Sequence, residues 1–311
     1  MPGRVSSLLI VVFWLVCASW FVRREYLPRW LASDNGPEFT VDLADEAAPR
    51  YTTWNIVRDD RKIGFLSCRM TFQPASDRFE VENRFQNLEL SVASPLIKVE
   101  VKVPSIIATS IVDKEGRLHS LQSESEFKLL FDAPFGMKTA LPELQLKARL
   151  SGEVQNGLFT GTSEIKSPLG DSKTTLKPFE VSQGNLFNPM QPQDRIFGLK
   201  PGRSWKVTLL DPISETIMQA AMQSVGNLAR TAGRDADGLP KLPQSGSNEY
   251  IAEVLSLPEK LDWKGAAEEC HVIEYRNDSV AGRTWVRISD GKVLQQEALG
   301  HGEKLTLTRD N

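Results

Sequence analysis

Hydrophobic and polar residues alternate along much of the chain beyond its first fifty residues. The alternation is clearest in three runs, Ile63–Phe72, Ile97–Val103 and Leu144–Leu150, in which apolar and polar side chains take turns. Strands with one apolar and one polar face are typical of antiparallel sheets whose apolar face is covered. The pattern predicts a mainly β fold, built on a large curved antiparallel sheet or a partly open barrel.

Turn signals separate the predicted strands. Asn156-Gly157 is the most specific of them, because both residues tolerate the positive φ angles of a tight hairpin. Further turns are predicted at Asp59-Asp60, Asp113–Gly116, Pro201-Gly202 and Asp290-Gly291. Ile213–Leu228 combines a helical spacing of apolar residues with a strand-like context, so both interpretations stay open. Ala229–Glu249 is rich in Gly, Pro, Asp and Ser, which predicts an exposed loop.

The first residues of the chain form a long apolar run. Val5–Val22 contains no charged residue, and its 18 residues would reach about 27 Å as a helix, which is just enough to cross a hydrocarbon core. No small-x-small cleavage site follows, and Arg23 and Arg24 stand where cleavage would occur, so a retained anchor is favoured over a cleavable signal peptide. The chain is therefore divided into a transmembrane anchor (5–22), an acidic juxtamembrane spacer (23–50) and a β-rich soluble module (51–311).

Composition and charge narrow the class of the module. The 311-residue chain is 41% hydrophobic and 25% charged, as in ordinary globular domains, which excludes wholesale disorder. Its net charge is −3, and it contains no basic stripe. Nucleic-acid binding depends on neutralising phosphates, so nucleic acid is excluded as a partner.

The sequence contains no motif that predicts catalysis, a cofactor or a metal ion. We find no Walker loop, GxGxxG after a strand, HExxH, GxSxG, kinase signature, CxxC or Cys/His cluster at zinc spacing, and so expect no catalytic, cofactor-binding or metal-ligating residue and no enzyme. Cys270 and His271 are neighbours, but adjacent side chains on a strand point to opposite faces, so they cannot form a dyad. His301, between two glycines, is expected to be solvated.

The cysteines and tryptophans of the module are expected to pack in its interior. Cys68 lies on the apolar face of its predicted strand, and Cys270 is interpreted as a small buried residue. A Cys68–Cys270 disulfide is an alternative, if closure of the sheet makes its first and last strands neighbours. Core packing is also the expected role of Trp54, Trp205, Trp263 and Trp285.

Three segments resemble the β-rich N-terminal region of bacterial membrane-anchored transglutaminase-like proteins. They are Trp54–Met70 (WNIVRDDRKIGFLSCRM), Gly198–Pro212 (GLKPGRSWKVTLLDP) and Thr284–Arg309 (TWVRISDGKVLQQEALGHGEKLTLTR). More loosely, the pattern of strand, Asp/Gly turn, strand and Glu is similar to the curved-sheet fold of lipoprotein-localisation carriers. Nothing in the chain matches the catalytic Cys, His and Asp of a transglutaminase-like enzyme, so no catalytic residue carries over.

The resemblance implies an extracytoplasmic module, because both families act outside the cytoplasm. The flanking charges favour the opposite orientation, since Arg23, Arg24 and Arg29 follow the apolar run and only Arg4 precedes it. We adopt the extracytoplasmic orientation as the expectation.

The expected function is that of a non-enzymatic accessory or interaction module of the bacterial cell envelope, with a protein partner at the membrane. The alternative is a binder or carrier of a lipid or acyl chain in the concave face of the sheet. A packed interior would favour the first and an open apolar cleft the second. The side chains that decide between them are those predicted to face inward, namely Leu66, Met70, Val99, Val101, Leu146 and Leu150.

Overall fold

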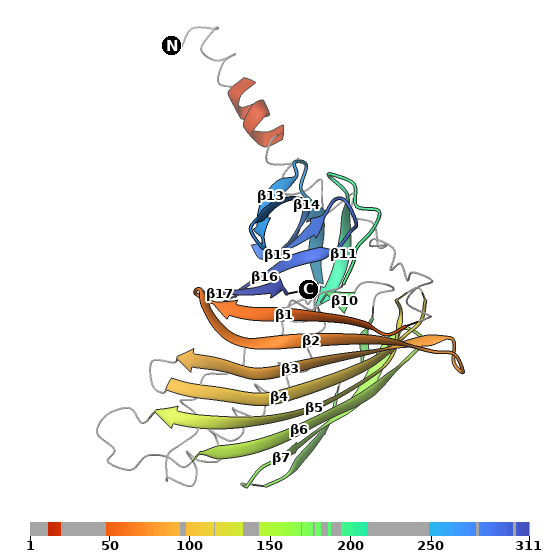
Figure 1. Cartoon of the computed structure of the whole chain (residues 1–311), viewed down its shortest axis with the longest axis vertical. Helices are drawn as coiled ribbons and strands as arrows, with labels where there is room; N and C mark the ends of the chain where they lie inside the picture. Colours follow the sequence, from red (N-terminus) through yellow and green to blue (C-terminus); the bar gives the residue numbers. More distant parts are fainter. Residues whose placement is uncertain are drawn as a thin grey trace.

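A computed structural model describes residues 12–19, 48–93, 98–114, 116–132, 143–168, 170–176, 178–181, 186–187, 194–209, 249–277, 280–300 and 303–310. Residues 12–19 form a helix, and nearly all the other regular structure is β (Figure 1). The strands are β1 (Arg50–Arg58), β2 (Arg61–Gln73), β3 (Arg78–Ala93), β4 (Lys98–Val112), β5 (Leu118–Asp132), β6 (Leu144–Gln155), β7 (Leu158–Lys166), β8 (Ser172–Thr175), β9 (Phe179–Glu180), β10 (Leu186–Phe187), β11 (Ser204–Leu209), β12 (Glu249–Val254), β13 (Glu259–Trp263), β14 (Ala266–Arg276), β15 (Val280–Arg287), β16 (Val293–Gly300) and β17 (Glu303–Arg309).

The strands belong to one large sheet. Hydrogen bonding passes from β7 through β6, β5, β4, β3 and β2 to β1. It then continues from β1 to β17 and through β16, β15 and β14 to β12 and β11. Strands β8 and β9 pair with the outer edge of β7, while β13 pairs with the first half of β14. Every pairing between described strands is antiparallel except that of β10 with β11. The predicted mainly β fold with a large antiparallel sheet is confirmed.

The sheet has a wide part and a tightly curled part. Strands β1 to β7 make the wide, curved part, and β11 to β17 curl up beside it (Figure 1). Among the described residues, buried apolar side chains form three clusters. The largest draws on both parts and includes Trp54, Leu66, Leu129 and Ile273. A second lies under the hairpins at one end of the wide part, and the third lies within the curled part.

The alternation in the sequence corresponds to the two faces of the sheet. In β6 the residues from Leu144 to Leu150 are buried and exposed in strict turn. In β4, Val101 and Val103 are buried while Lys102 is exposed. In β2, Leu66 is fully buried and Cys68 packs against the largest cluster. One face of these strands is thus removed from water, as the period of two predicted.

The predicted turns are also confirmed. Asn156 and Gly157 have φ angles of 52° and 77°, and Asp59 and Asp60 have 48° and 63°, as a tight hairpin requires. Gly116, Gly202 and Gly291 likewise have positive φ at the other three predicted turns.

A pair of glycines makes room for the Phe159 ring of the second cluster. Gly152 and Gly161 face each other on β6 and β7. A Cβ atom at Gly152 would lie 2.6 Å from the Thr160 backbone oxygen and would meet the ring of Phe159. Only a residue without a side chain therefore lets the buried Phe159 ring close over the strand.

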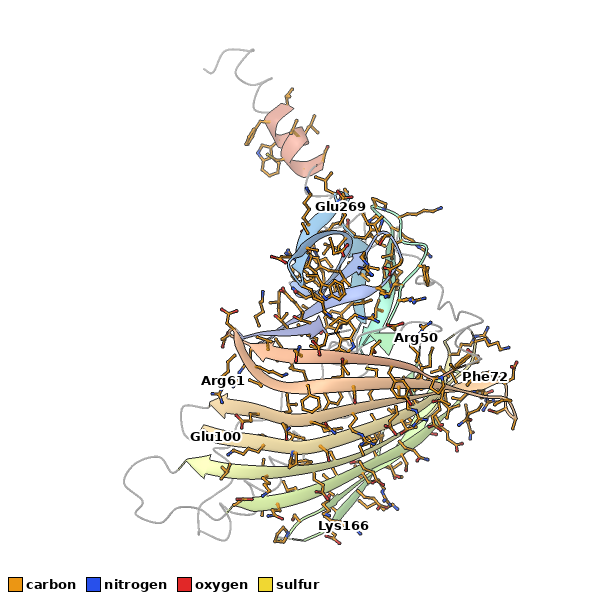
Figure 2. The ribbon with its side chains drawn as sticks, viewed as in Figure 1. Arg50, Arg61, Phe72, Glu100, Lys166 and Glu269 are labelled. Carbon is orange, nitrogen blue, oxygen red and sulfur yellow. The ribbon has the colours of Figure 1, made fainter. Side chains whose placement is uncertain are left out.

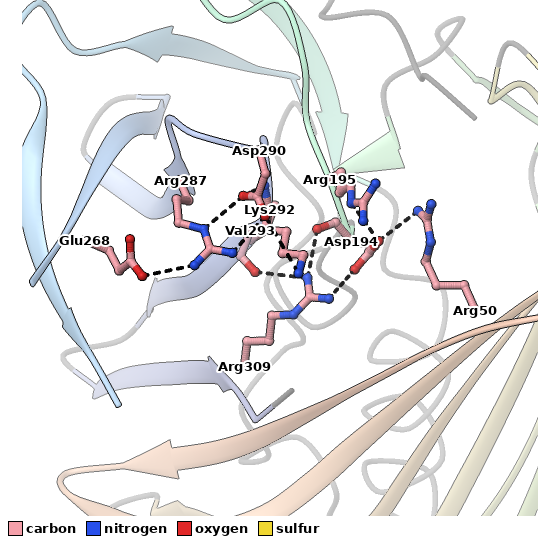
Figure 3. A network of polar contacts seen from close by, with 9 residues as sticks. All are labelled: Arg50, Asp194, Arg195, Glu268, Arg287, Asp290, Lys292, Val293 and Arg309. Carbon is pink, nitrogen blue, oxygen red and sulfur yellow. Dashed lines mark hydrogen bonds and ion pairs between the residues drawn. The ribbon is translucent and has the colours of Figure 1, made fainter. Parts of the chain in front are cut away.

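Asp194 joins the start of the sheet to its end. Its carboxylate lies 2.8 Å from Arg50 of β1 and 2.6 Å from Arg309 of β17 (Figure 3). Arg309 also donates to the Asp194 backbone oxygen at 3.0 Å, and its guanidinium stacks over the Trp54 ring at 5.8 Å. The Arg309 side chain is only 5% exposed, so its charge depends on this carboxylate rather than on water.

We expect Asp194→Asn to lower the free energy of unfolding by about 3 kcal/mol, because it removes the charge of a carboxylate that contacts the buried Arg309 guanidinium. The measurement is urea unfolding of the full chain. The control is Asp77→Asn, which breaks an exposed ion pair with Lys114 and should cost less than about 1 kcal/mol. Equal losses in the two variants would show that the Asp194 contacts do not hold the sheet together.

Several sequence predictions fall on residues outside the described part. Of the predicted anchor 5–22, only 12–19 is described, and its side chains are exposed. Within the described residues, the structure contains no helix with the length and apolar character needed to cross a membrane. The spacer 23–50 is described only from residue 48, and Arg50 already belongs to β1. Residues 213–228 and 229–248 lie outside the description, and Glu249, predicted as loop, begins β12.

The alternative of a Cys68–Cys270 disulfide is wrong. Both cysteines are free. The first and last strands, β1 and β17, are indeed neighbours, but the cysteines sit on β2 and β14. Strands β1, β17, β16 and β15 separate those two, and the thiols pack in different clusters.

Candidate functional site

The face of β4 to β7 opposite the buried cluster is polar, and we call it the outer face. Its side chains come from the positions that alternate with the buried ones, such as Glu124 and Glu126 of β5 and Lys147 and Arg149 of β6. All four are exposed, whereas their neighbours Ser125 and Ala148 are buried. Figure 2 shows side chains along both faces of these strands.

Opposite charges meet across neighbouring strands of the outer face. Arg149 lies opposite Glu124 and contacts it at 2.6 Å, and Lys147 lies opposite Glu126 and contacts it at 2.6 Å. Glu164 of β7 is opposite Arg149 on one side and contacts Lys173 of β8 at 2.5 Å on the other. Directly opposed charges of different sign stabilise a strand pair modestly and set its register.

The pKa values on this face follow from the same contacts. The hydrogen bond from Lys173 holds the pKa of Glu164 below its usual value. The hydrogen bond to Glu126 raises the pKa of Lys147. Water screens these groups, so the pairs contribute little to stability, and their charges stay available to a partner.

The outer face contains a hollow of about 500 Å³. That volume lies within the usual range of ligand sites, and eight of the ten residues that line it are charged or polar. Two rows of side chains that cross the strands enclose it. The lining residues are Ser105, Ile107, Glu124, Ser125, Glu126, Lys147, Ala148, Arg149, Glu164 and Lys166.

The cysteines and histidines singled out in the sequence do not come together as a site. Cys270 is fully buried in the third cluster, and burial raises its pKa to about 11. Burial likewise raises the pKa of Cys68 to about 12, so neither thiol is a ready nucleophile at neutral pH. His271 follows Cys270 on β14 and is half-buried, and His301 is outside the described residues.

The tryptophans pack largely as predicted. Trp54, Trp205 and Trp285 are buried. Trp263 is partly buried against the third cluster and donates a hydrogen bond to the Arg309 backbone oxygen at 3.0 Å. The indole nitrogen of Trp285 donates to Glu259 at 3.1 Å. Within the described ranges, no group of three or more His, Cys, Asp and Glu residues is placed to hold a metal ion.

A second set of charges lies in the curled part of the sheet. Glu274 of β14 is 2% exposed and contacts both Arg276 and Arg283, the latter at 2.8 Å. Glu253 of β12 lies directly opposite Glu274, and its carboxyl group makes no hydrogen bond or ion pair with any described residue. Burial, and to a lesser extent the Glu274 charge, raise the pKa of Glu253, although Arg276 opposes the shift.

We expect Glu253→Gln to change how stability depends on pH. The folded state holds the Glu253 proton more tightly than the unfolded state, so the associated stability is present below the ordinary pKa of 4.5 and is lost as pH rises through the raised value. The variant should therefore melt at a higher temperature than the wild type at about pH 8 but not at about pH 4. Thermal unfolding followed by circular dichroism measures both.

The matched control for this variant is Glu153→Gln, at an exposed position of β6. It should leave the difference between the two melting temperatures unchanged. A Glu253→Gln variant that gained nothing at the higher pH would show that the carboxyl group is not held in an unfavourable charged form.

Comparisons with known proteins do not identify the chain. No protein-family model matches it, and neither a curated protein nor a solved structure gives a match. These comparisons identify no relationship to transglutaminase-like proteins or to lipoprotein-localisation carriers.

The charged outer face was missed in the sequence as a site. The alternation in the runs Ile97–Val103 and Leu144–Leu150 predicts a polar face. Which charges of that face lie opposite one another depends on strand register, which the alternation does not give. The available signal was the abundance of Lys, Arg and Glu at alternate positions of consecutive strands. The register of the strands places those charges directly opposite one another.

Proposed function

We propose that the chain is a non-enzymatic accessory or interaction module of a bacterial cell envelope, held at the membrane by its N-terminal segment, which contacts a protein partner through the outer face. The observation that carries the proposal is the outer face itself, with its exposed ion pairs around a polar hollow. Charges arranged in this way contribute more to the specificity and orientation of a protein contact than to its affinity.

The burial of the opposite face favours a partner over an apolar ligand. Of the six residues predicted to face inward, Leu66, Val101, Leu146 and Leu150 are at most 5% exposed. Such values leave no water-sized space against these side chains, as in a packed core. Met70 is partly buried in the second cluster, and the Val99 side chain lies outside the described residues. An acyl chain would need an apolar cleft, whereas the hollow is lined by charges.

The N-terminal helix supports a location at a membrane. Four consecutive apolar side chains of this helix are each more than 60% exposed, namely Phe13, Trp14, Leu15 and Val16. They form a contiguous apolar surface of the kind that a membrane or a partner covers. We place the module outside the cytoplasm because of its resemblance to extracytoplasmic families, against the weak bias of the flanking arginines.

A fusion tests the orientation. We expect a phosphatase that is active only outside the cytoplasm, joined after Asn311 of the full chain, to be active in intact cells. A fusion that accumulates normally and sediments with membranes but stays inactive would place the module in the cytoplasm. Failure to sediment with membranes would contradict the anchor instead.

Cross-linking tests the contact surface. Gln122 is exposed on β5 beside Glu124 and makes no ion pair, so a photo-activatable phenylalanine analogue at this position should cross-link one discrete protein in living cells. Leu257, which is 78% exposed in the curled part, provides the matched control and should give no such product. Arg149→Glu should weaken the Gln122 product by about tenfold, because it reverses a charge of the outer face between Glu124 and Glu164. Equal products at both positions would rule out the outer face as the contact.

A further inference from the structure

One pair of directly opposed like charges lines the hollow of the outer face. Lys147 of β6 lies directly opposite Lys166 of β7, and both line the hollow. Like charges that are directly opposed destabilise a strand pair. Natural proteins break such local rules most often at functional sites.

A second opposed lysine pair on this face does not line the hollow. Lys102 lies opposite Lys128, but Lys128 contacts Glu143 at 2.9 Å. Lys102 also faces Glu89 on its other side and lies close enough to Glu143 to help lower the pKa of that carboxyl. Each of these lysines therefore has a carboxylate beside it.

Lys166 is compensated only at longer range, since its charge helps to lower the pKa of Glu164 as that of Lys102 does for Glu143. Lys147 contacts Glu126 at 2.6 Å, whereas the side chain of Lys166 makes no hydrogen bond or ion pair with any residue that the structure describes. The other lining carboxylates are already in contact with cations, Glu124 with Arg149 and Glu164 with Lys173. Among the three cations that line the hollow, Lys166 is the one whose side chain makes no ion pair with a described residue, so its donors are available to a ligand.

We propose that Lys147 and Lys166 form a phosphate-binding subsite in the hollow. Side chains directly opposite on antiparallel strands have Cβ atoms about 5 Å apart, so the two ammonium groups can donate to two oxygens of one phosphate. Lys147 uses one of its three donors on Glu126 and keeps the others for a ligand. Ser105, in the same row across the strands, supplies a hydroxyl to the lining.

The phosphate occupies only one end of the hollow. A volume of about 500 Å³ holds a much larger molecule, so the phosphate is the charged end of a ligand or of a partner's modified group. This subsite deepens the proposed role of the outer face and rests on it. Direct binding of a small phosphate tests the subsite without the partner, so the two proposals can fail separately.

The experiment is isothermal titration calorimetry on the full chain, purified in a non-ionic detergent at low ionic strength. The probes are inorganic phosphate, glycerol 3-phosphate as a soluble lipid-headgroup monoester, and acetate. We expect both phosphates to bind and acetate to bind far more weakly. The tighter of the two phosphates indicates whether the natural source is a free ion or an ester.

Lys166→Gln should weaken phosphate binding by about tenfold or more, because a charge-assisted donor is lost. The unliganded variant should melt at the same temperature as the wild type or higher, since the repulsion with Lys147 is removed. Lys260→Gln removes the same charge from an exposed position of β13 and should leave the affinity unchanged.

Three results would overturn the subsite: no heat of binding from either phosphate, equal weakening by Lys166→Gln and Lys260→Gln, or acetate binding as tight as phosphate. Phosphate binding that depends on Lys166, together with no cross-linked product at Gln122, would retain the subsite and reject the protein partner.

Discussion

The pairing of β1 with β17 is the contact on which the rest of the structure depends. Strand β1 is hydrogen-bonded to β2 on one side and to β17 on the other, so it belongs to both the wide and the curled parts. It joins the first strand of the sheet to the last, across most of the chain, and the loop-closure entropy of so distant a contact must be offset by strong interactions. Arg50 and Arg309 provide them by sharing the carboxylate of Asp194 beside the buried Trp54.

Because β1 joins the two parts of the sheet, one face is buried in a shared core and the other is exposed. The largest apolar cluster includes Leu146 of β6, Trp205 of β11 and Ile273 of β14, so both parts of the sheet bury their apolar faces in one core. The outer face of β4 to β7 is then free of any role in the interior. Its ion pairs are exposed and contribute little to stability. A face with such small effects on folding can vary in charge to suit a ligand or partner.

Local features of the fold could be predicted from the sequence, and distant ones could not. The alternation in Leu144–Leu150 and the Asn156-Gly157 hairpin depend only on neighbouring residues, and both are confirmed. The alternative of a Cys68–Cys270 disulfide depended on the first and last strands being neighbours. These strands are neighbours, but the two cysteines are free because they lie on other strands. Asp194 has no sequence signal, since it lies in an irregular segment and its partners are over one hundred residues away. The rows of charges on the outer face could not be predicted, because they depend on the register of four strands.

The lysine at position 166 is not explained by folding. Across β5 and β6 the outer face opposes Glu126 to Lys147, and continuation of that pattern would place a carboxylate on β7. A glutamate at 166 would give Lys147 a counter-charge on each side, as Glu124 and Glu164 do for Arg149. The chain instead carries a second lysine, at an exposed position where no packing constraint demands one. A lysine that faces a like charge and whose side chain makes no ion pair with a described residue is best explained by something it binds, and a positive charge in such a hollow selects an anion.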